Sequence, residues 1–285
     1  MIGILASFIG ATLQAINYLL TQDAQYRYKI RGLHLLIGSQ IVLGIIGFLC
    51  LLSFGYLSLL DISLLIPLLK VNLPYIIGQY ALIKAIQESD ASVASPLLAL
   101  KVPALALMYM VLFHQHFTLI QWIAMTLIIS LAYFFSSLSG KIKFKPLLYI
   151  TIASFSYGTS DLFITDLSQQ LPADTLTERA LITNCINYFF CGMVSLPIFF
   201  SMKISTKQVW QLKWVGLAWF VAVFFLIIGF NLSGVVGSNV VQSSRGVMAV
   251  ILGLYFFKET RKDPTLMKKL CGAVGMCLGI TLFYI

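Results

Sequence analysis

Residues 89–115 read SDASVASPLLALKVPALALMYMVLFHQ, and they align without a gap to residues 233–259, SGVVGSNVVQSSRGVMAVILGLYFFKE. Identities are few, but both stretches have a serine-led start, a segment of small residues, one cation and then an apolar run. The two cations, Lys101 and Arg245, coincide. A similar spacing relates residues 6–8, Ala-Ser-Phe, to residues 153–155, which are also Ala-Ser-Phe. The sequence therefore predicts two repeats, residues 1–140 and residues 141–285.

The composition is that of an integral membrane protein. Of 285 residues, 59% are hydrophobic and 10% are charged, and the mean hydropathy is +0.93. About a quarter of the residues in a soluble domain are charged, so this chain has too few charges to cover a water-exposed surface. Its apolar residues occur in runs of about 20, the length that crosses a hydrocarbon core. Because backbone polar groups must be satisfied inside the bilayer, such runs are expected to be helices.

Ten apolar runs follow one another with short connections. We expect an all-α membrane protein with transmembrane helices near residues 1–21, 33–56, 62–85, 91–113, 118–138, 146–165, 180–202, 213–233, 237–258 and 267–285. Each repeat then holds five helices, and the odd number turns the second repeat over relative to the first. Two inverted five-helix repeats are the architecture of many secondary transporters, in which the substrate site lies near the midplane between the halves.

The basic residues are concentrated on one set of connections. The net charge is +9, and nearly all cations outside the spans follow the odd-numbered spans, whereas the connections after even-numbered spans carry only Arg179. Under the positive-inside rule, the odd-numbered connections face the cytoplasm and both termini face outward. Anionic lipid headgroups are the expected partners of these cations. No basic surface is interleaved with aromatic residues, so we expect no nucleic acid partner.

A family resemblance is carried by three stretches. Residues 89–100, SDASVASPLLAL, resemble the fourth helix of an EamA-type repeat, residues 121–124, QWIA, resemble the start of its fifth helix, and residues 257–259, FKE, followed by Gly272 resemble the second copy. The chain is thus similar to the drug/metabolite transporter superfamily. The resemblance implies ten helices as five plus five, a bacterial cytoplasmic membrane and no nucleotide hydrolysis.

The sequence departs from this family in three respects. Gln115 stands where an acidic residue is usual, and Ala124 stands where a glycine is usual. Members of the family are generally drawn with both termini in the cytoplasm, whereas the charge distribution of this chain predicts both termini outside. The resemblance and the charge distribution therefore give opposite orientations.

Four charged residues lie well inside predicted spans, and each needs a physical explanation. They are Lys70, Lys101, Asp161 and Arg245. A charge at this depth costs about 3 kcal/mol on insertion scales. One interpretation pairs Asp161 with a single cation as a structural ion pair. The other interpretation places Lys101, Arg245 and Lys70 around a wet cavity that binds an anion, with Lys101 and Arg245 brought together by the repeat.

Uncharged polar residues extend the candidate site. Ser238, Gln242 and Arg245 share one helix face, and the predicted substrate-binding residues are Lys70, Lys101, Arg245, Gln242, Asn187, Gln14 and Gln79. The alternative for any single amide is a hydrogen bond between helices, as is common in bundles. Prolines flank two of the cations: Pro67 and Pro74 flank Lys70, and Pro96 and Pro103 flank Lys101. We expect kinks there, either static or part of a moving element.

Other chemistries are not indicated. The five cysteines form no C-x-x-C pair and are expected to be apolar filler. His114 and His116 lack a third partner, so neither a metal site nor a cofactor is expected. No phosphate-binding loop is present. The histidines lie at helix ends, which argues against an intramembrane enzyme acting on lipid.

The sequence predicts a secondary transporter that works by alternating access and carries a small metabolite. The substrate is expected to be anionic or carboxylate-bearing, such as an amino acid, an organic acid or a phosphorylated metabolite. Asp161 is the candidate for a coupling proton, because a desolvated carboxylate can take one up. The alternative is a proton-coupled exporter of hydrophobic or cationic drug-like compounds, with Asp161 as the recognising anion. An intramembrane enzyme, a channel, a non-transporting scaffold and a homodimer are left open.

Overall fold

The computed structural model describes residues 1–89, 91–139, 144–256 and 266–285. The described part of the chain is helical and contains no β-strand. The helices are α1 (Ile2–Arg27), α2 (Gly32–Ser53), α3 (Leu65–Glu88), α4 (Ala91–Leu97), α5 (Lys101–Phe113), α6 (Leu119–Ser139), α7 (Phe144–Gln170), α8 (Leu176–Ser201), α9 (Thr206–Gln211), α10 (Lys213–Ser233), α11 (Val235–Gln242), α12 (Arg245–Phe256) and α13 (Leu266–Phe283). Short 3₁₀ turns lie at Tyr56–Leu59, Ile62–Leu64 and Leu98–Leu100.

The protein has a multi-pass membrane architecture. Among the described residues, 7 helical segments are long and apolar enough to cross a bilayer. Two shorter apolar helices, Leu119–Phe134 and Val274–Phe283, lie within α6 and α13. Each predicted span coincides with a helix, or with two consecutive helices, and the all-α membrane fold predicted from the sequence is confirmed at this level.

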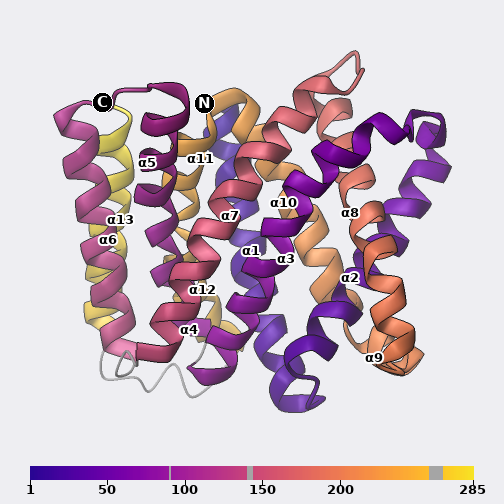
Figure 1. The fold of residues 1–285 in the computed structure, drawn as a ribbon. Coiled ribbons are helices and arrows are strands. Elements are labelled where there is room, and N and C mark those ends of the chain that lie inside the picture. The colour runs from indigo at the N-terminus through magenta and orange to yellow at the C-terminus, as the bar shows by residue number, and fades with distance from the viewer. Residues whose placement is uncertain (90, 140–143, 257–265) are drawn as a thin grey trace.

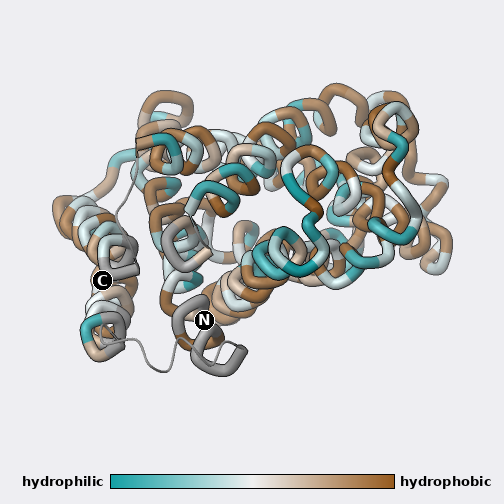
Figure 2. Tube along the Cα trace, turned by 90° about the horizontal axis from the view of Figure 1, so that it is seen from below, coloured by the Kyte–Doolittle hydropathy of each residue, from teal (hydrophilic) through white to brown (hydrophobic). Residues whose placement is uncertain are grey.

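The distribution of side chains is the reverse of that in a soluble protein. Large apolar side chains are exposed on the outside of the bundle, including Phe48, Ile66, Leu73, Val111 and Leu232. Amides and charges are instead buried inside it, including Gln14, Asn72, Asn184, Lys101 and Arg245. Figure 2 shows how often hydrophobic residues recur along the coloured trace of the bundle. This arrangement fits a hydrocarbon solvent outside and a polar interior.

Four long helix pairs build the bundle. Helix α1 packs along α10, α2 along α8, α3 along α7, and α6 along α13. The pair α6 and α13 stands at one edge (Figures 1 and 2). Small residues allow the closest approach: a Cβ on Gly44 of α2 would lie 2.6 Å from the Cα of Gly192 on α8. Close packing of this kind replaces the hydrophobic effect between helices in a bilayer.

Two helices are broken where the sequence predicted single spans. The first break is the turn Leu98–Leu100 between α4 and α5, and it lies between Pro96 and Pro103 as the prolines predicted. The second is the Ser243–Ser244 turn between α11 and α12, where no proline occurs. The two breaks touch, because a Cβ on Gly246 would lie 2.9 Å from the Cα of Pro96. Helix α3, by contrast, continues through Pro74 without a break.

Both termini lie at the same end of the bundle, and α9 lies at the opposite end (Figure 1). The α1–α2 connection, which carries Arg27, Lys29 and Arg31, is at the α9 end, and so is the α8–α10 connection with Lys203 and Lys207. The basic connections described by the structure therefore share one end, as the charge pattern predicted. Which side of the membrane that end faces stays a prediction.

Candidate functional site

A small cavity lies in the middle of the bundle. Its wall includes Gln14, Lys101, Asp161, Asn187 and Arg245 together with a group of aromatic rings. The volume is about 30 Å³, which holds a water molecule or two and excludes a metabolite. The protein is therefore closed around its centre in this conformation, and binding a larger molecule requires the helices to separate.

Lys101 and Asp161 form an ion pair on one side of the cavity. The Lys101 ammonium contacts Asp161 Oδ2, and the two side chains are 4% and 15% exposed. Asn239 of α11 donates a second hydrogen bond to the same oxygen, at 2.8 Å. The ammonium also lies 5.8 Å from the centre of the Tyr157 ring. The ion pair predicted as one interpretation of the sequence is thus present, and it joins the first residue of α5 to α7.

Arg245 is the first residue of α12, in the second half of the chain, and has different partners. Its Nη1 donates to Gln14 Oε1 and to Gln242 Oε1, both at 3.2 Å. Its Nη2 donates to the main-chain oxygen of Leu98 at 2.9 Å. The Nε has no hydrogen-bond partner among the described residues. Arg245 is 3% exposed, and all three of its acceptors are neutral.

The helix break before Lys101 supplies one of these contacts. The Leu98 carbonyl lies in the 3₁₀ turn at Leu98–Leu100, where the main-chain N–H of Lys101 also donates to it. Arg245, which lies in the other half of the chain, donates a hydrogen bond to this carbonyl. The broken fourth span therefore provides one of the acceptors that hold the guanidinium.

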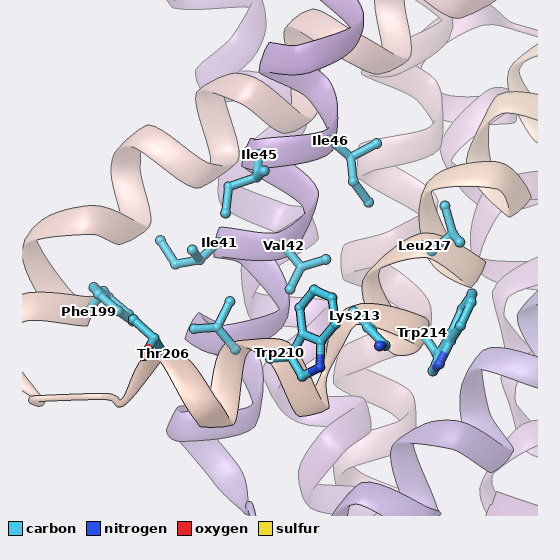
Figure 3. Close-up of a pocket in the computed structure, with 11 residues that line it drawn as sticks. Ile41, Val42, Ile45, Ile46, Phe199, Thr206, Trp210, Lys213, Trp214 and Leu217 are labelled. Carbon is cyan, nitrogen blue, oxygen red and sulfur yellow. The ribbon is translucent and has the colours of Figure 1, made fainter.

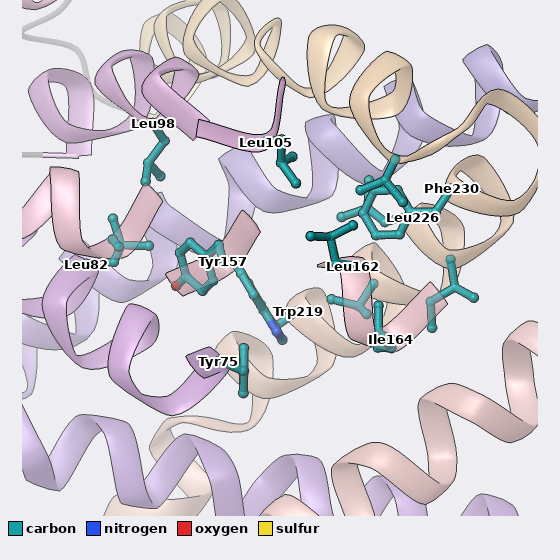
Figure 4. Close-up of a cluster of buried hydrophobic side chains, with 14 of the residues drawn as sticks. Tyr75, Leu82, Leu98, Leu105, Tyr157, Leu162, Ile164, Trp219, Leu226 and Phe230 are labelled. Carbon is teal, nitrogen blue, oxygen red and sulfur yellow. The ribbon is translucent and has the colours of Figure 1, made fainter. Parts of the chain in front are cut away.

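A cluster of aromatic side chains forms the rest of the wall. The Tyr75 ring centre lies 5.9 Å from that of Trp219 and 5.8 Å from that of Tyr188, and the Tyr157 centre lies 6.0 Å from that of Trp219. Tyr18 is 6.3 Å from Trp219. Figure 4 shows Tyr75, Tyr157 and Trp219 side by side in the interior. Trp219 Nε1 donates to the Tyr188 hydroxyl at 2.7 Å, which fixes both rings.

The remaining predicted amides lie at or next to the cavity. Gln14 and Asn187 line it. Gln242 contacts Arg245, because its side-chain oxygen accepts a hydrogen bond from Arg245 Nη1. Gln79 accepts a hydrogen bond from the Tyr157 hydroxyl, so it contacts a ring of the wall. Asn187 also accepts from Asn72 Nδ2 at 2.8 Å, which is a hydrogen bond between α8 and α3.

Lys70 is the predicted site residue that the structure separates from the others. Its side chain is exposed on the outside of α3, and its ammonium lies 5.8 Å from the Phe163 ring centre. The helix begins at Leu65, so Lys70 is in its second turn, close enough to the end for the long side chain to reach headgroups. The prediction that Lys70 lines the cavity is wrong for this conformation.

Sequence reasoning missed several residues of the site. Asn239, Tyr18, Tyr75 and Trp219 were not selected, although Tyr18 follows Gln14 by four residues and therefore shares its helix face. An aromatic residue in an apolar span gives no sign of whether it faces lipid or the interior. The structure also contains no cluster of three potential metal ligands within its described residues.

Comparisons with known proteins give a fold and no family. Neither the protein-family models nor the curated proteins match the sequence. By contrast, 22 chains of solved structures match the fold. One of these, a protein known from its crystal structure, has 14% sequence identity and a TM-score of 0.63, and the match covers 97% of this chain and 98% of the other. At this identity the likeness shows a common fold alone.

Proposed function

We propose that this protein is a secondary transporter of the drug/metabolite type that carries a small carboxylate-bearing metabolite by alternating access. Its ten spans would form two inverted five-helix repeats, residues 1–140 and 141–285. The membrane is proposed to be the bacterial cytoplasmic membrane, on the resemblance alone. The chemistry of the centre supports binding of a solute and does not require a bound cofactor.

The pairing of helices supports the inverted repeat. In this repeat, the spans of the first half (α1, α2, α3, α4–α5 and α6) correspond in order to those of the second half (α7, α8, α10, α11–α12 and α13). Helix α1 then corresponds to α7 and α10 to α3, so exchanging the halves converts the α1–α10 pair into the α7–α3 pair. The same exchange converts α2–α8 and α6–α13 into themselves. A two-fold axis between the halves has these properties. The two helix breaks also correspond, since each one immediately precedes the cation of its half, Lys101 or Arg245.

The observation that carries the proposed substrate class is the charge on Arg245. Lys101 is balanced by Asp161, whereas the buried guanidinium of Arg245 has only neutral acceptors among the described residues. An arginine stays protonated, so the buried Arg245 side chain keeps its positive charge. A carboxylate can accept two parallel hydrogen bonds from a guanidinium, and such charged hydrogen bonds are about twice as strong as neutral ones. A carboxylate is therefore a better partner for Arg245 than Gln14 or Gln242.

Asp161 is the proposed site of a coupling proton. A proton on Asp161 would end the ion pair with Lys101 and weaken the link between α5 and α7. Loss of that link would favour separation of the two halves, which the closed centre requires. Exchange of one solute for another without a proton is the simpler alternative.

A second candidate function rests on the aromatic cluster. Tyr18, Tyr75, Tyr157, Tyr188 and Trp219 surround the cavity next to Asp161. Aromatic faces attract organic cations, and a carboxylate attracts them more strongly. The same centre would then bind a hydrophobic cation, with Lys101 displaced from Asp161.

Counterflow uptake into proteoliposomes separates these functions. The panel contains amino acids, organic acids, phosphate esters and cationic dyes, and the variants are Arg245→Gln, Lys101→Gln and Asp161→Asn. Lys70→Gln is the matched control, because Lys70 is an exposed lysine of the same bundle. We expect uptake of a carboxylate whose KM rises roughly thirtyfold or more in Arg245→Gln, corresponding to about 2 kcal/mol for loss of a buried charge partner.

Two results would contradict the proposal. Equal loss of uptake in Lys70→Gln and Arg245→Gln would mean that the guanidinium has no specific role. Uptake of dyes that depends on Asp161 and is indifferent to Arg245 would establish the second candidate in its place.

A further inference from the structure

Two apolar grooves run side by side on the outer face of the bundle, away from the central cavity. The larger has a volume of about 650 Å³ and lies between α2 and the α9–α10 corner. The smaller has a volume of about 210 Å³ and lies between α2 and α8. The two grooves share Ile41 and Ile45 of α2 as a common wall. Both are lined almost entirely by apolar side chains, as Figure 3 shows for the larger one.

One end of the larger groove is polar and cationic. Trp210, Trp214 and Lys213 line it there, and the Lys213 ammonium lies 3.7 Å from the Trp210 ring centre and 5.5 Å from that of Trp214 (Figure 3). The two indoles are 68% and 57% exposed. Exposed tryptophans at a helix end are typical of the membrane–water interface. The α8–α10 connection also carries Lys203 and Lys207, and no acidic residue occurs from Ser201 to Lys213.

The distance along α2 from the α9–α10 corner to the far end of the two grooves matches one leaflet of a bilayer. The α9–α10 corner is level with Gly38, because a Cβ there would lie 2.6 Å from a methyl group of Leu212. The far end of the smaller groove is at Leu49, eleven residues further along α2. At about 1.5 Å per residue this is roughly 16 Å, and half of a hydrocarbon core of about 30 Å is roughly 15 Å.

We propose that this face holds one anionic phospholipid. Its two acyl chains occupy the two grooves on either side of Ile41 and Ile45, and its phosphate lies against Lys213 at the α9–α10 corner. Two adjacent apolar grooves that together extend from a cationic corner to about the depth of one leaflet correspond to the shape and charge of such a lipid. The proposal is independent of the transported substrate.

A second copy of the chain fits this face less well. Two copies in one membrane with the same orientation would meet here by the same surface on both sides. The cationic corners, each with Lys203, Lys207 and Lys213, would then face one another at the same depth. Like charges in contact are unfavourable, whereas a phosphate neutralises them.

Native mass spectrometry of the detergent-solubilised protein tests the proposal. The protein is mixed with equal amounts of phosphatidylglycerol and phosphatidylcholine that carry the same acyl chains. We expect one phosphatidylglycerol to be retained preferentially. Lys213→Gln should reduce this preference about fivefold, the contribution of one cation near an anionic headgroup. Ile45→Trp, which fills the shared wall, should abolish retention of the lipid.

Two variants serve as matched controls. Lys84→Gln removes another half-buried lysine, whose ammonium lies 5.7 Å from the Tyr80 ring centre but lines neither groove. Leu73→Trp adds the same ring to a 63% exposed position on α3. Both controls should retain the lipid as the unchanged protein does. Equal retention of the two lipids, or equal losses in the controls, would overturn the proposal. A dimer that disappears in Ile45→Trp while lipid retention is unchanged would also overturn it and identify a second copy as the occupant.

Discussion

The centres of the two halves each contain a helix break followed by a cation, but the two cations have different partners. In the first half a short turn precedes Lys101, and in the second half a short turn precedes Arg245. Lys101 contacts the carboxylate of Asp161, whereas Arg245 contacts the amides of Gln14 and Gln242 and one main-chain oxygen. One cation is therefore compensated and the other is not.

This difference separates a structural role from a binding role. Burying a charge next to its counter-ion gives a site that is stable without any solute. Burying a guanidinium among neutral acceptors keeps hydrogen bonds but leaves the charge itself uncompensated. We infer that the Lys101 side holds the bundle together and that the Arg245 side is reserved for an anion.

The largest expected effect on stability is on the compensated side. Asp161→Asn leaves the Lys101 ammonium buried without a carboxylate, and removal of one partner of a buried pair typically costs 3–5 kcal/mol. Because Asp161 is 15% exposed, we expect the lower end, about 3 kcal/mol. Thermal unfolding in detergent measures this loss.

A double variant checks the interpretation of that loss. Lys101→Met combined with Asp161→Asn removes the unpaired charge, so most of the stability should return. Arg245→Met is the counterpart on the other side and should change stability less, by about 1–2 kcal/mol, because it removes an uncompensated buried charge but leaves the Gln14 and Gln242 oxygens without this donor. A loss for Arg245→Met as large as that for Asp161→Asn would remove the distinction between the two centres.

The contact between the two breaks gives the next largest effect. Gly246→Ala would place a Cβ 2.9 Å from the Cα of Pro96, so the two broken helices must move apart. Overpacking of this kind costs about 1–3 kcal/mol. Gly55→Ala is the contrasting control, because a Cβ there meets no atom within 4 Å and any loss must come from the positive φ of 73°. Transport impaired in Gly246→Ala and unaffected in Gly55→Ala would link the crossing of the breaks to function.

Much of this fold could be predicted from the sequence, because long apolar runs in a bilayer form helices. The spans were placed by length and hydropathy, and Pro96 and Pro103 predicted a kink where the structure has the break before Lys101. The break before Arg245 could not be found in the same way. It contains Ser243 and Ser244 and no proline, and only its correspondence with the first half indicates it.

The site could be predicted in part, because charges inside a membrane are few. Lys101, Asp161 and Arg245 were selected on that ground, and the structure brings them to one cavity. Lys70 was selected for the same reason, but hydropathy gives neither the depth of a residue nor the face of its helix. Trp219 and Tyr75 were missed because aromatic side chains occur both against lipid and inside helix bundles, so their presence in a span does not indicate which side they face.

Changing the shape of the Arg245 side chain while keeping its charge should raise the KM less than removing the charge. Arg245→Lys keeps the positive charge but replaces a planar fork by a single ammonium. We expect the KM for a carboxylate substrate to rise roughly tenfold, or about 1.4 kcal/mol. Lys101→Arg keeps a cation beside Asp161 and should have a weaker effect on KM. A larger rise in Lys101→Arg would indicate that the substrate binds the compensated side.

The smallest expected effect concerns the hydrogen bond by which α11 contacts the compensated pair. Asn239 donates to Asp161 Oδ2 at 2.8 Å and also to the Val235 carbonyl at 2.9 Å, so its amide is shared between the site and its own helix. A single hydrogen bond between membrane helices contributes about 0.6 kcal/mol. We expect Asn239→Ala to lower stability by about that amount and to leave the carboxylate KM unchanged, because Arg245 keeps all its contacts. A double-mutant cycle with Asp161→Ala, which removes both carboxylate oxygens, isolates the Asn239–Asp161 interaction. A coupling energy near zero would mean that the bond from Asn239 to Val235 within α11 is the one that matters, and that the Lys101–Asp161 pair is held without help from Asn239.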